Sequence, residues 1–163
     1  MHTSLIINER ELEAAQLAGD YLQAIWDKYN ALWKAEPGKL MENFSEEQLS
    51  FLFYGVLYRQ VQNGGFLQLL FNGYAPYIFG SPLADSLKVW GAVPTAELIE
   101  SIQTSCLQVA GEIKDKASFE DMSVLYVQYP EFENYDKTFY KNTGVSEVKS
   151  YVESHLSYFV TVQ

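Results

Sequence analysis

Cysteine and histidine are nearly absent from this sequence, which has one of the former and two of the latter among 163 residues. The single cysteine, Cys106, cannot form an internal disulfide or a thiolate metal cluster, and its place on an apolar stripe predicts a small core side chain. His2 lies at the terminus, and His155 is expected to be a partly buried packing residue. No HExxH, GxSxG or phosphate-binding glycine motif is present. We therefore assign no catalytic residue, no metal and no cofactor, and predict a binding protein and not an enzyme.

Basic residues are also scarce. Lys and Arg number 11 against 21 Asp and Glu, which gives a net charge of −10. A surface with this charge repels phosphate, so direct binding to nucleic acid or to an anionic membrane is not expected, whereas basic proteins are attracted. The sequence contains neither a signal-peptide pattern nor a membrane-spanning apolar run. These absences predict a cytoplasmic protein with no membrane partner.

The apolar residues are arranged with helical periodicity, and we predict an all-α fold with a single compact multi-helix domain over residues 1–163. The first helix is expected to begin at the N-cap Asn8 and to continue as one long helix until Pro37-Gly38. Its buried stripe consists of residues at three- and four-residue steps: Ala15, Ala18, Leu22, Ile25, Trp26, Tyr29 and Trp33.

A second helix is predicted to start at Ser45, because Ser45-Glu46-Glu47-Gln48 has the form of a capping box. The helix is apolar nearly all round, which places it in the middle of the domain. Asn63-Gly64-Gly65 is expected to end it in a tight structural turn, and a short helix over residues 66–71 should follow. The alternative is that this turn lets a ligand approach the backbone closely.

The second half of the chain contains further helix signals. Ser81-Pro82 and Pro94-Thr95 predict two helix starts, and the last helix is expected to cover residues 146–159. The region from residue 115 to 134 is harder to assign. Its run Val124–Val127 has strand propensity but no partner, so we read it as buried helix or loop. Glu131, Glu133 and Asp136 lack the EF-hand pattern and predict a solvated acidic loop.

Negative charge is concentrated in two blocks, residues 9–47 and 115–136, each with a net charge of −5. In the first block Glu13, Asp20 and Asp27 are seven residues apart. On one helix this spacing would align them on a stripe about 10.5 Å apart, with Glu9 beside Glu13. We name these four as candidate phosphate-mimicking carboxylates, and from the second block we add four others: Glu120, Asp121, Glu131 and Glu133. Charge that serves only solubility is the alternative.

The segment from Gln60 to Gln68 reads Gln-Val-Gln-Asn-Gly-Gly-Phe-Leu-Gln and is followed by Phe71-Asn72. It resembles the Gln-x-x-Asn-Gly-Gly-Phe-x-Gln signature of a bacterial family of domains of unknown function. Residues 87–92 and the later Tyr135-Asp136-x-x-Phe139-Tyr140 are similar to further pieces of that pattern. Within this family, the size and acidity of the chain resemble those of the neisserial DNA mimics.

The resemblance implies an acidic homodimer that occupies the DNA-binding face of a helix-turn-helix transcription factor and relieves its repression. The signature itself is mostly uncharged, so it specifies the fold and not the mimicry. The alternative function is an acidic protein-interaction module with an aromatic surface around Tyr126, Tyr129, Phe132 and Tyr135, because aromatic side chains are favoured at interfaces.

Overall fold

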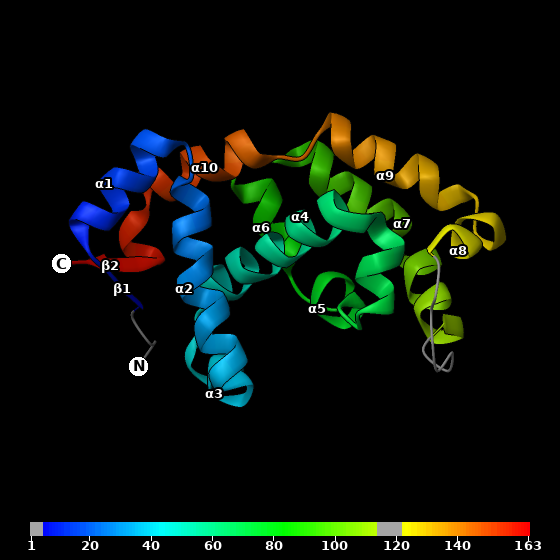
Figure 1. Cartoon of the computed structure of the whole chain (residues 1–163), viewed down its shortest axis with the longest axis horizontal. Helices are drawn as coiled ribbons and strands as arrows, with labels where there is room; N and C mark the ends of the chain where they lie inside the picture. The colour runs from blue at the N-terminus through cyan, green and yellow to red at the C-terminus, as the bar shows by residue number, and fades with distance from the viewer. Residues whose placement is uncertain (1–4, 114–121) are drawn as a thin grey trace. The chain divides into compact units, whose positions relative to one another are not determined.

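A computed structural model describes residues 5–113 and 122–163 and confirms an all-α fold. Helices make up most of the described chain, and two short strands pair near its ends (Figure 1). None of the described helices combines the length and the apolar character needed to cross a membrane. Two compact units can be distinguished: unit 1 comprises residues 1–52 and 145–163, and unit 2 comprises residues 53–144.

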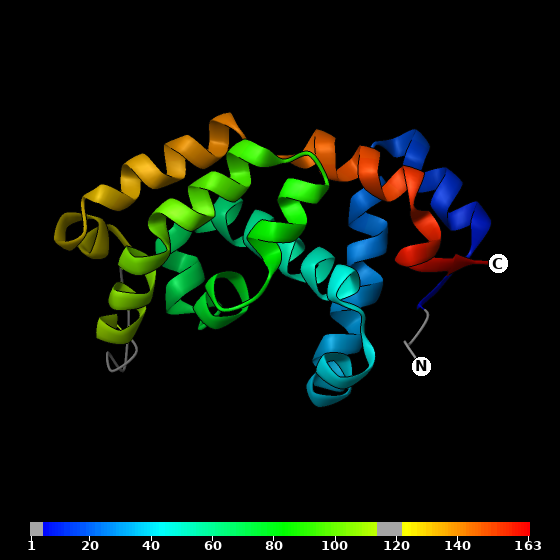
Figure 2. The ribbon, with the colours of Figure 1, turned by 180° about the vertical axis from the view of Figure 1, so that it is seen from behind.

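Unit 1 contains both ends of the chain. Its elements are β1 (Leu5–Ile7), α1 (Glu9–Ala18), α2 (Tyr21–Ala35), α3 (Pro37–Asn43), the start of α4 (Glu46–Phe71), α10 (Val145–Ser154), the 3-10 helix η1 (Leu156–Tyr158) and β2 (Val160–Val162). The two strands pair in parallel, with Leu5 opposite Val160 and Ile7 opposite Val162, and they lie side by side in both ribbon views (Figures 1 and 2). The prediction that the last helix continues to Phe159 was wrong, because α10 ends at Ser154 and the chain then turns into β2.

The prediction of one long first helix was also wrong. Asn8 is the N-cap, as expected, and its side chain accepts a hydrogen bond from the Arg10 amide at 2.9 Å. However, α1 ends at Gly19, whose φ of 81° is left-handed and whose amide reaches back to carbonyls of the last turn. A new helix, α2, begins at Tyr21, and α3 begins at Pro37, where a helix was predicted only to end.

An aromatic cluster forms the core of unit 1. The Trp26 and Phe51 rings stack at 5.5 Å, and Tyr29 meets Phe44 and Phe51 edge-on at 5.3 Å. The buried Tyr29 hydroxyl donates a hydrogen bond to the Phe159 carbonyl at 2.6 Å. This bond joins residues 130 positions apart in sequence and secures the C-terminal segment against α2. The capping box at the start of α4 is confirmed, since Ser45 and Gln48 exchange hydrogen bonds of 2.9 and 3.1 Å.

Unit 2 contains the remainder of α4 together with α5 (Ala75–Phe79), α6 (Leu83–Val89), α7 (Val93–Ile113), α8 (Met122–Gln128) and α9 (Glu131–Lys141). Helix α7 packs against α5, α6 and α9. Its predicted buried face is confirmed by six buried side chains: Ala96, Ile99, Ile102, Cys106, Val109 and Ile113. Helix α4 is broken at Gly65, which has φ 79° and ψ −178°, so the two-helix prediction with a turn at Asn63-Gly64-Gly65 is confirmed.

The region between residues 122 and 141 is helical. Val124–Val127 lies in α8, but Val124 and Val127 are 60% and 83% exposed, so the prediction that this run is buried holds only for Leu125. The predicted acidic loop at residues 131–136 was wrong, because these residues form the first half of α9. Pro130 occupies the N-cap position of α9. The carboxylate of Asp136 was expected in solvent but is buried.

Candidate protein-binding surface

The four candidate carboxylates of unit 1 are all exposed, but they do not form the predicted stripe. Glu9 and Glu13 lie on α1, Asp27 lies on α2, and Asp20 is the N-cap residue between the two helices. The left-handed backbone at Gly19 changes the chain direction, so a seven-residue spacing no longer repeats along one axis. The structure therefore distributes these charges over two helices.

Unit 1 nevertheless has an excess of exposed negative charge. Its sequence contains eleven acidic and five basic residues, a net charge of −6. One base is used inside the unit, since Lys28 of α2 pairs with Glu11 of α1 at 3.1 Å. Asp27 accepts a hydrogen bond from the Gln23 amide at 3.0 Å. Glu13 and Asp20 make no ion pair with a basic residue in the described part of the chain.

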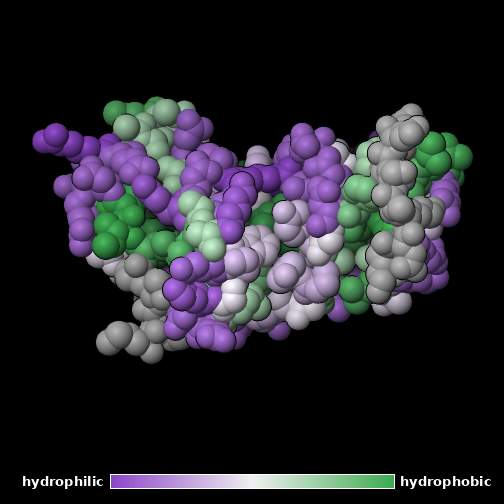
Figure 3. All heavy atoms as spheres, turned by 60° about the horizontal axis from the view of Figure 1, so that its bottom comes forward, coloured by the Kyte–Doolittle hydropathy of each residue, from purple (hydrophilic) through white to green (hydrophobic). Residues whose placement is uncertain are grey.

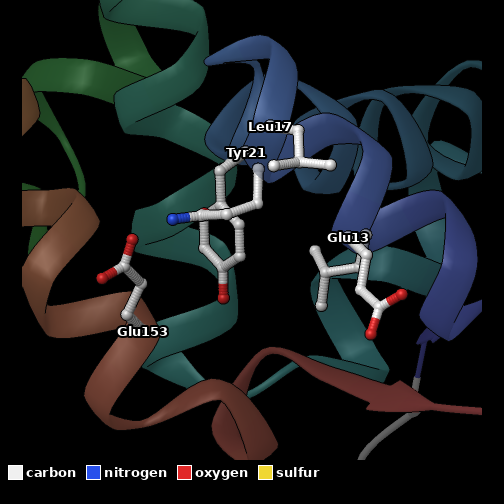
Figure 4. A pocket seen from close by; sticks show the side chains of 6 residues that line it. Glu13, Leu17, Tyr21 and Glu153 are labelled. Atoms are coloured by element: carbon white, nitrogen blue, oxygen red, sulfur yellow. The ribbon is translucent and has the colours of Figure 1, made fainter.

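An open pocket of about 570 Å³ lies beside these acids in unit 1. It is lined by residues of three helices: Leu12, Glu13, Gln16 and Leu17 of α1, Tyr21 of α2 and Glu153 of α10. In Figure 4, Glu13 and Glu153 lie on opposite sides of the Tyr21 ring. Sequence patterns did not indicate Leu17, Tyr21 or Glu153 as site residues. The signal that could have found the site is Leu17, an apolar residue off the predicted buried stripe and 90% exposed.

The second set of candidate carboxylates belongs to unit 2. Glu120 and Asp121 lie outside the described residues. Glu131 and Glu133 are exposed in the first turn of α9, where negative charge is favoured by the helix dipole. Glu133 pairs with Lys137 at 3.1 Å, an exposed contact of small energetic weight. Figure 3 shows one face of the molecule, on which hydrophilic residues separate smaller hydrophobic patches.

A buried polar cluster surrounds the break in α4. The carboxylate of Asp136 accepts hydrogen bonds from the Phe66 amide at 2.8 Å and from the Tyr126 hydroxyl. It therefore caps the second half of α4, from a helix far away in sequence. Burial raises the pKa of Asp136, against the lowering effect of these hydrogen bonds. Burial and the nearby carboxylate also raise the pKa of Tyr126.

Uncharged side chains of the signature form a set of hydrogen bonds with one another at the same break. The side-chain amide of Gln68 donates a hydrogen bond to the side-chain oxygen of Gln60 at 3.1 Å. The side-chain amide of Asn72 donates to the same oxygen at 2.8 Å. Asn63 in turn donates to Gln68 at 3.2 Å. A side chain at Gly65 would collide with Tyr126 and Asp136. These contacts support the structural interpretation of the turn, since the space above it is filled by side chains of the protein itself.

The residues proposed for an aromatic surface are largely packed inside unit 2. Phe132 is fully buried, and the Tyr129 ring, in edge contact with Phe132, is also buried. The Tyr126 hydroxyl is directed to Gly64 and Asp136. Tyr126 and Tyr135 are half-buried, and the Tyr135 ring meets Phe132 edge-on at 5.0 Å. The predicted aromatic surface is therefore wrong for Tyr129 and Phe132, which belong to the core, and the other two rings are only partly exposed.

The remaining reactive residues have packing roles. Cys106 is fully buried, and burial raises the pKa of its thiol, which suppresses the reactive thiolate. His155 is partly buried, as predicted, and its ring stacks on that of Tyr151 at a centroid distance of 4.1 Å. Its Nδ1 lies 2.9 Å from the Tyr151 carbonyl oxygen.

The sequence is similar to one protein family and to a named protein. Residues 42–155 match the sequence model of the family described as DMP19-like protein. A segment of 98 residues is 35% identical to the DNA mimic protein DMP19 of Neisseria meningitidis serogroup B (strain ATCC BAA-335 / MC58). The segment covers 60% of this chain and 59% of that relative. Since the family model matches well over half of the sequence, the chain belongs to the DMP19-like protein family.

Proposed function

We propose that this protein is a DNA mimic that binds the DNA-binding face of a helix-turn-helix transcription factor, prevents that factor from binding DNA and thereby relieves repression. The observation that carries the proposal is the similarity to a protein named as a DNA mimic. The net charge of −10 and the exposure of Glu9, Glu13, Asp20 and Asp27 support it. Both are properties that a substitute for the phosphate backbone requires.

In this function carboxylates take the places of phosphates and meet the Lys and Arg side chains that otherwise grip DNA. Each exposed pair contributes little, about 0.2 to 1 kcal/mol, so affinity comes from several pairs together. The collective negative field also speeds the encounter with a basic partner. Binding should therefore weaken steeply as salt is added. The protein acts by occupying a surface, without catalysing a reaction.

The proposal includes a cytoplasmic homodimer. Dimeric helix-turn-helix proteins read two half-sites about 34 Å apart, and two protomers related by a two-fold axis would match that symmetry. Sedimentation equilibrium at micromolar concentration should give the dimer mass, and a monomer would contradict this part. We also infer that the Gln60 to Gln68 segment is the family signature, and the hydrogen bonds among Gln60, Asn63 and Gln68 beside the break in α4 give it a structural role.

Capture followed by competition tests the function. The protein is immobilised, the proteins retained from a cell extract at low salt are identified by mass spectrometry, and the DNA-binding protein found is purified with its DNA site. A gel shift then measures whether the protein displaces that DNA. The protein alone should not retard DNA, because its net charge repels phosphate. A retarded band with the protein alone would contradict the proposal.

A further inference from the structure

The pocket of unit 1 combines apolar and acidic groups in one place. Leu17 is 90% exposed, and it lies beside Leu12 and Tyr21 on the pocket wall. Leu12 and Tyr21 are largely buried, so Leu17 supplies most of the exposed apolar surface, which an apolar group of another molecule would remove from water. Glu13 and Glu153 lie at the same pocket, from α1 and α10. A ligand that fits must therefore have an apolar part and a positive charge.

A cation from the protein itself already lies at this site. The Lys149 ammonium is 5.9 Å from the centre of the Tyr21 ring and 3.6 Å from a Glu153 carboxylate oxygen. The first distance lies just within the range of a cation–π contact. Burial raises the pKa of the Tyr21 hydroxyl, and the charge of Glu153 adds a smaller contribution in the same direction. The site therefore stabilises positive charge. The Lys149 ammonium pairs with Glu153, and Glu13 has no basic partner among the described residues.

We propose that this pocket receives one arginine side chain of the basic protein partner. The aliphatic stem of the arginine packs on Leu12 and Leu17, and the guanidinium contacts Glu13 and Glu153. Arginine suits the site better than lysine, because its planar group has five donors, enough to contact two carboxylates and the Tyr21 hydroxyl together. The Tyr21 hydroxyl makes no hydrogen bond to another described residue. The choice of partner rests on the proposed function, whereas the chemistry of the pocket does not.

The test uses the full-length protein and a small probe, so it needs no transcription factor. The capped peptide acetyl-Gly-Arg-Gly-amide is titrated while NMR follows the methyl groups of Leu12 and Leu17 and the ring of Tyr21. These signals should shift and saturate. A peptide with citrulline, the uncharged isostere of arginine, should bind at least about fivefold more weakly, since it lacks the charge. The lysine peptide should bind more weakly than the arginine peptide.

Variants locate the binding. Glu13→Gln with Glu153→Gln should weaken the arginine peptide about fivefold, and Leu17→Ala about twofold. The charge-matched control, Glu42→Gln with Glu147→Gln, alters two exposed carboxylates of the same unit and should change the affinity less than twofold. Lys149→Gln should strengthen binding about twofold, because it removes the internal competitor. Circular dichroism checks that each variant stays folded.

Three results would overturn the proposal: equal binding of the arginine and citrulline peptides, shifts confined to residues outside the pocket, or a pocket variant that behaves like its control. The peptide titration and the DNA displacement can fail independently, so the pocket and the proposed function are tested separately. If the arginine peptide binds as described but the protein fails to displace DNA from any captured partner, the pocket stands and the DNA-mimic function falls. If DNA is displaced equally by the parent and by the pocket variant, the function stands and the pocket proposal falls.

Discussion

Unit 2 buries one carboxylate, that of Asp136, whereas none of the described carboxylates of unit 1 is buried. In unit 2 the buried Asp136 and the Gln60 side chain complete the break in α4. In unit 1 the rings of Trp26, Tyr29 and Phe51 fill the interior, and Glu13 is exposed beside a pocket. The buried carboxylate of unit 2 therefore stabilises a backbone break, whereas the exposed carboxylates of unit 1 are available to a partner.

The match to the family model also differs between the two units. It covers residues 42–155, which include all of unit 2, and it leaves out β1, α1 and α2. The candidate carboxylates Glu9, Glu13, Asp20 and Asp27 and most of the pocket lie in the part left out. We expect the matched region to determine the fold and the first two helices to contribute to the choice of partner. The following changes test that difference.

The largest effect should come from the break in α4. Gly65→Val places a branched side chain in a backbone conformation with φ 79° and ψ −178°, which only glycine adopts easily, and drives it into Tyr126 and Asp136. We expect a loss of about 3 kcal/mol or more in the free energy of unfolding, measured by denaturant titration.

Gly111→Ala is the matched control, because Gly111 lies in α7 with open space around it. It should stabilise the protein by about 0.5 to 1 kcal/mol. Gly64→Val should cost less than Gly65→Val, since the clash at Gly64 is with the flexible Gln68 side chain. A Gly65→Val protein that keeps its stability but loses its partner would show that the turn is a binding site.

A second prediction concerns the core of unit 1. Tyr29→Phe removes the hydroxyl that donates to the Phe159 carbonyl and leaves that carbonyl without this donor in a buried position. The loss should be about 2 kcal/mol by denaturant titration. Tyr158→Phe, at a residue 51% exposed, should change stability by less than about 0.5 kcal/mol. Equal effects of the two substitutions would contradict the assigned role of the Tyr29 hydroxyl.

The third prediction compares the two acidic sets in partner binding. Glu13→Gln, Asp20→Asn and Asp27→Asn together should weaken binding to the captured DNA-binding protein by about 1.5 kcal/mol and flatten its salt dependence, with the fold intact. The comparison variant neutralises Glu120, Asp121, Glu131 and Glu133. If only the second variant weakens binding, the mimic surface lies in unit 2. If neither does, the charge serves solubility.

The smallest effect should be a pH dependence from Asp136. Its pKa is raised in the folded state, so it contributes stability below the unfolded value near 3.8 that is lost as the pH rises through the folded pKa. Asp136→Asn keeps an oxygen for the Phe66 amide but cannot titrate. The parent should therefore gain stability relative to this variant, by about 1 kcal/mol or less, when the pH falls from neutral to about 4. Parallel pH profiles from denaturant titrations would contradict the raised pKa.

Local signals explain which parts of the fold could be predicted. The capping box at Ser45, the N-cap Asn8 and the face of α7 depend on residues close in sequence, and the structure confirms them. Gly19 was misjudged because a single glycine inside a periodic pattern is tolerated by a helix and is also a common helix end. The apolar stripe continues across it, so periodicity alone could not detect the break.

The remaining errors involve contacts that are distant in sequence. The short strand Val160–Val162 is defined by its pairing with Leu5–Ile7, and a run of three residues has no periodicity of its own. The burial of Asp136 depends on the Phe66 amide, 70 residues away. The candidate carboxylates were found as exposed residues because charge predicts exposure, but their arrangement depends on the angle at Gly19, which the sequence does not specify.

The central claim, that this protein replaces DNA on a DNA-binding protein, is tested most directly by competition at several salt concentrations. The captured DNA-binding protein is held on its labelled DNA site, and the acidic protein is added while fluorescence anisotropy follows the bound DNA. We expect complete release of the DNA, with a midpoint that rises steeply as salt increases, because the acidic protein and the DNA use the same basic surface. Formation of a ternary complex, or an unchanged anisotropy at saturating protein, would contradict the account.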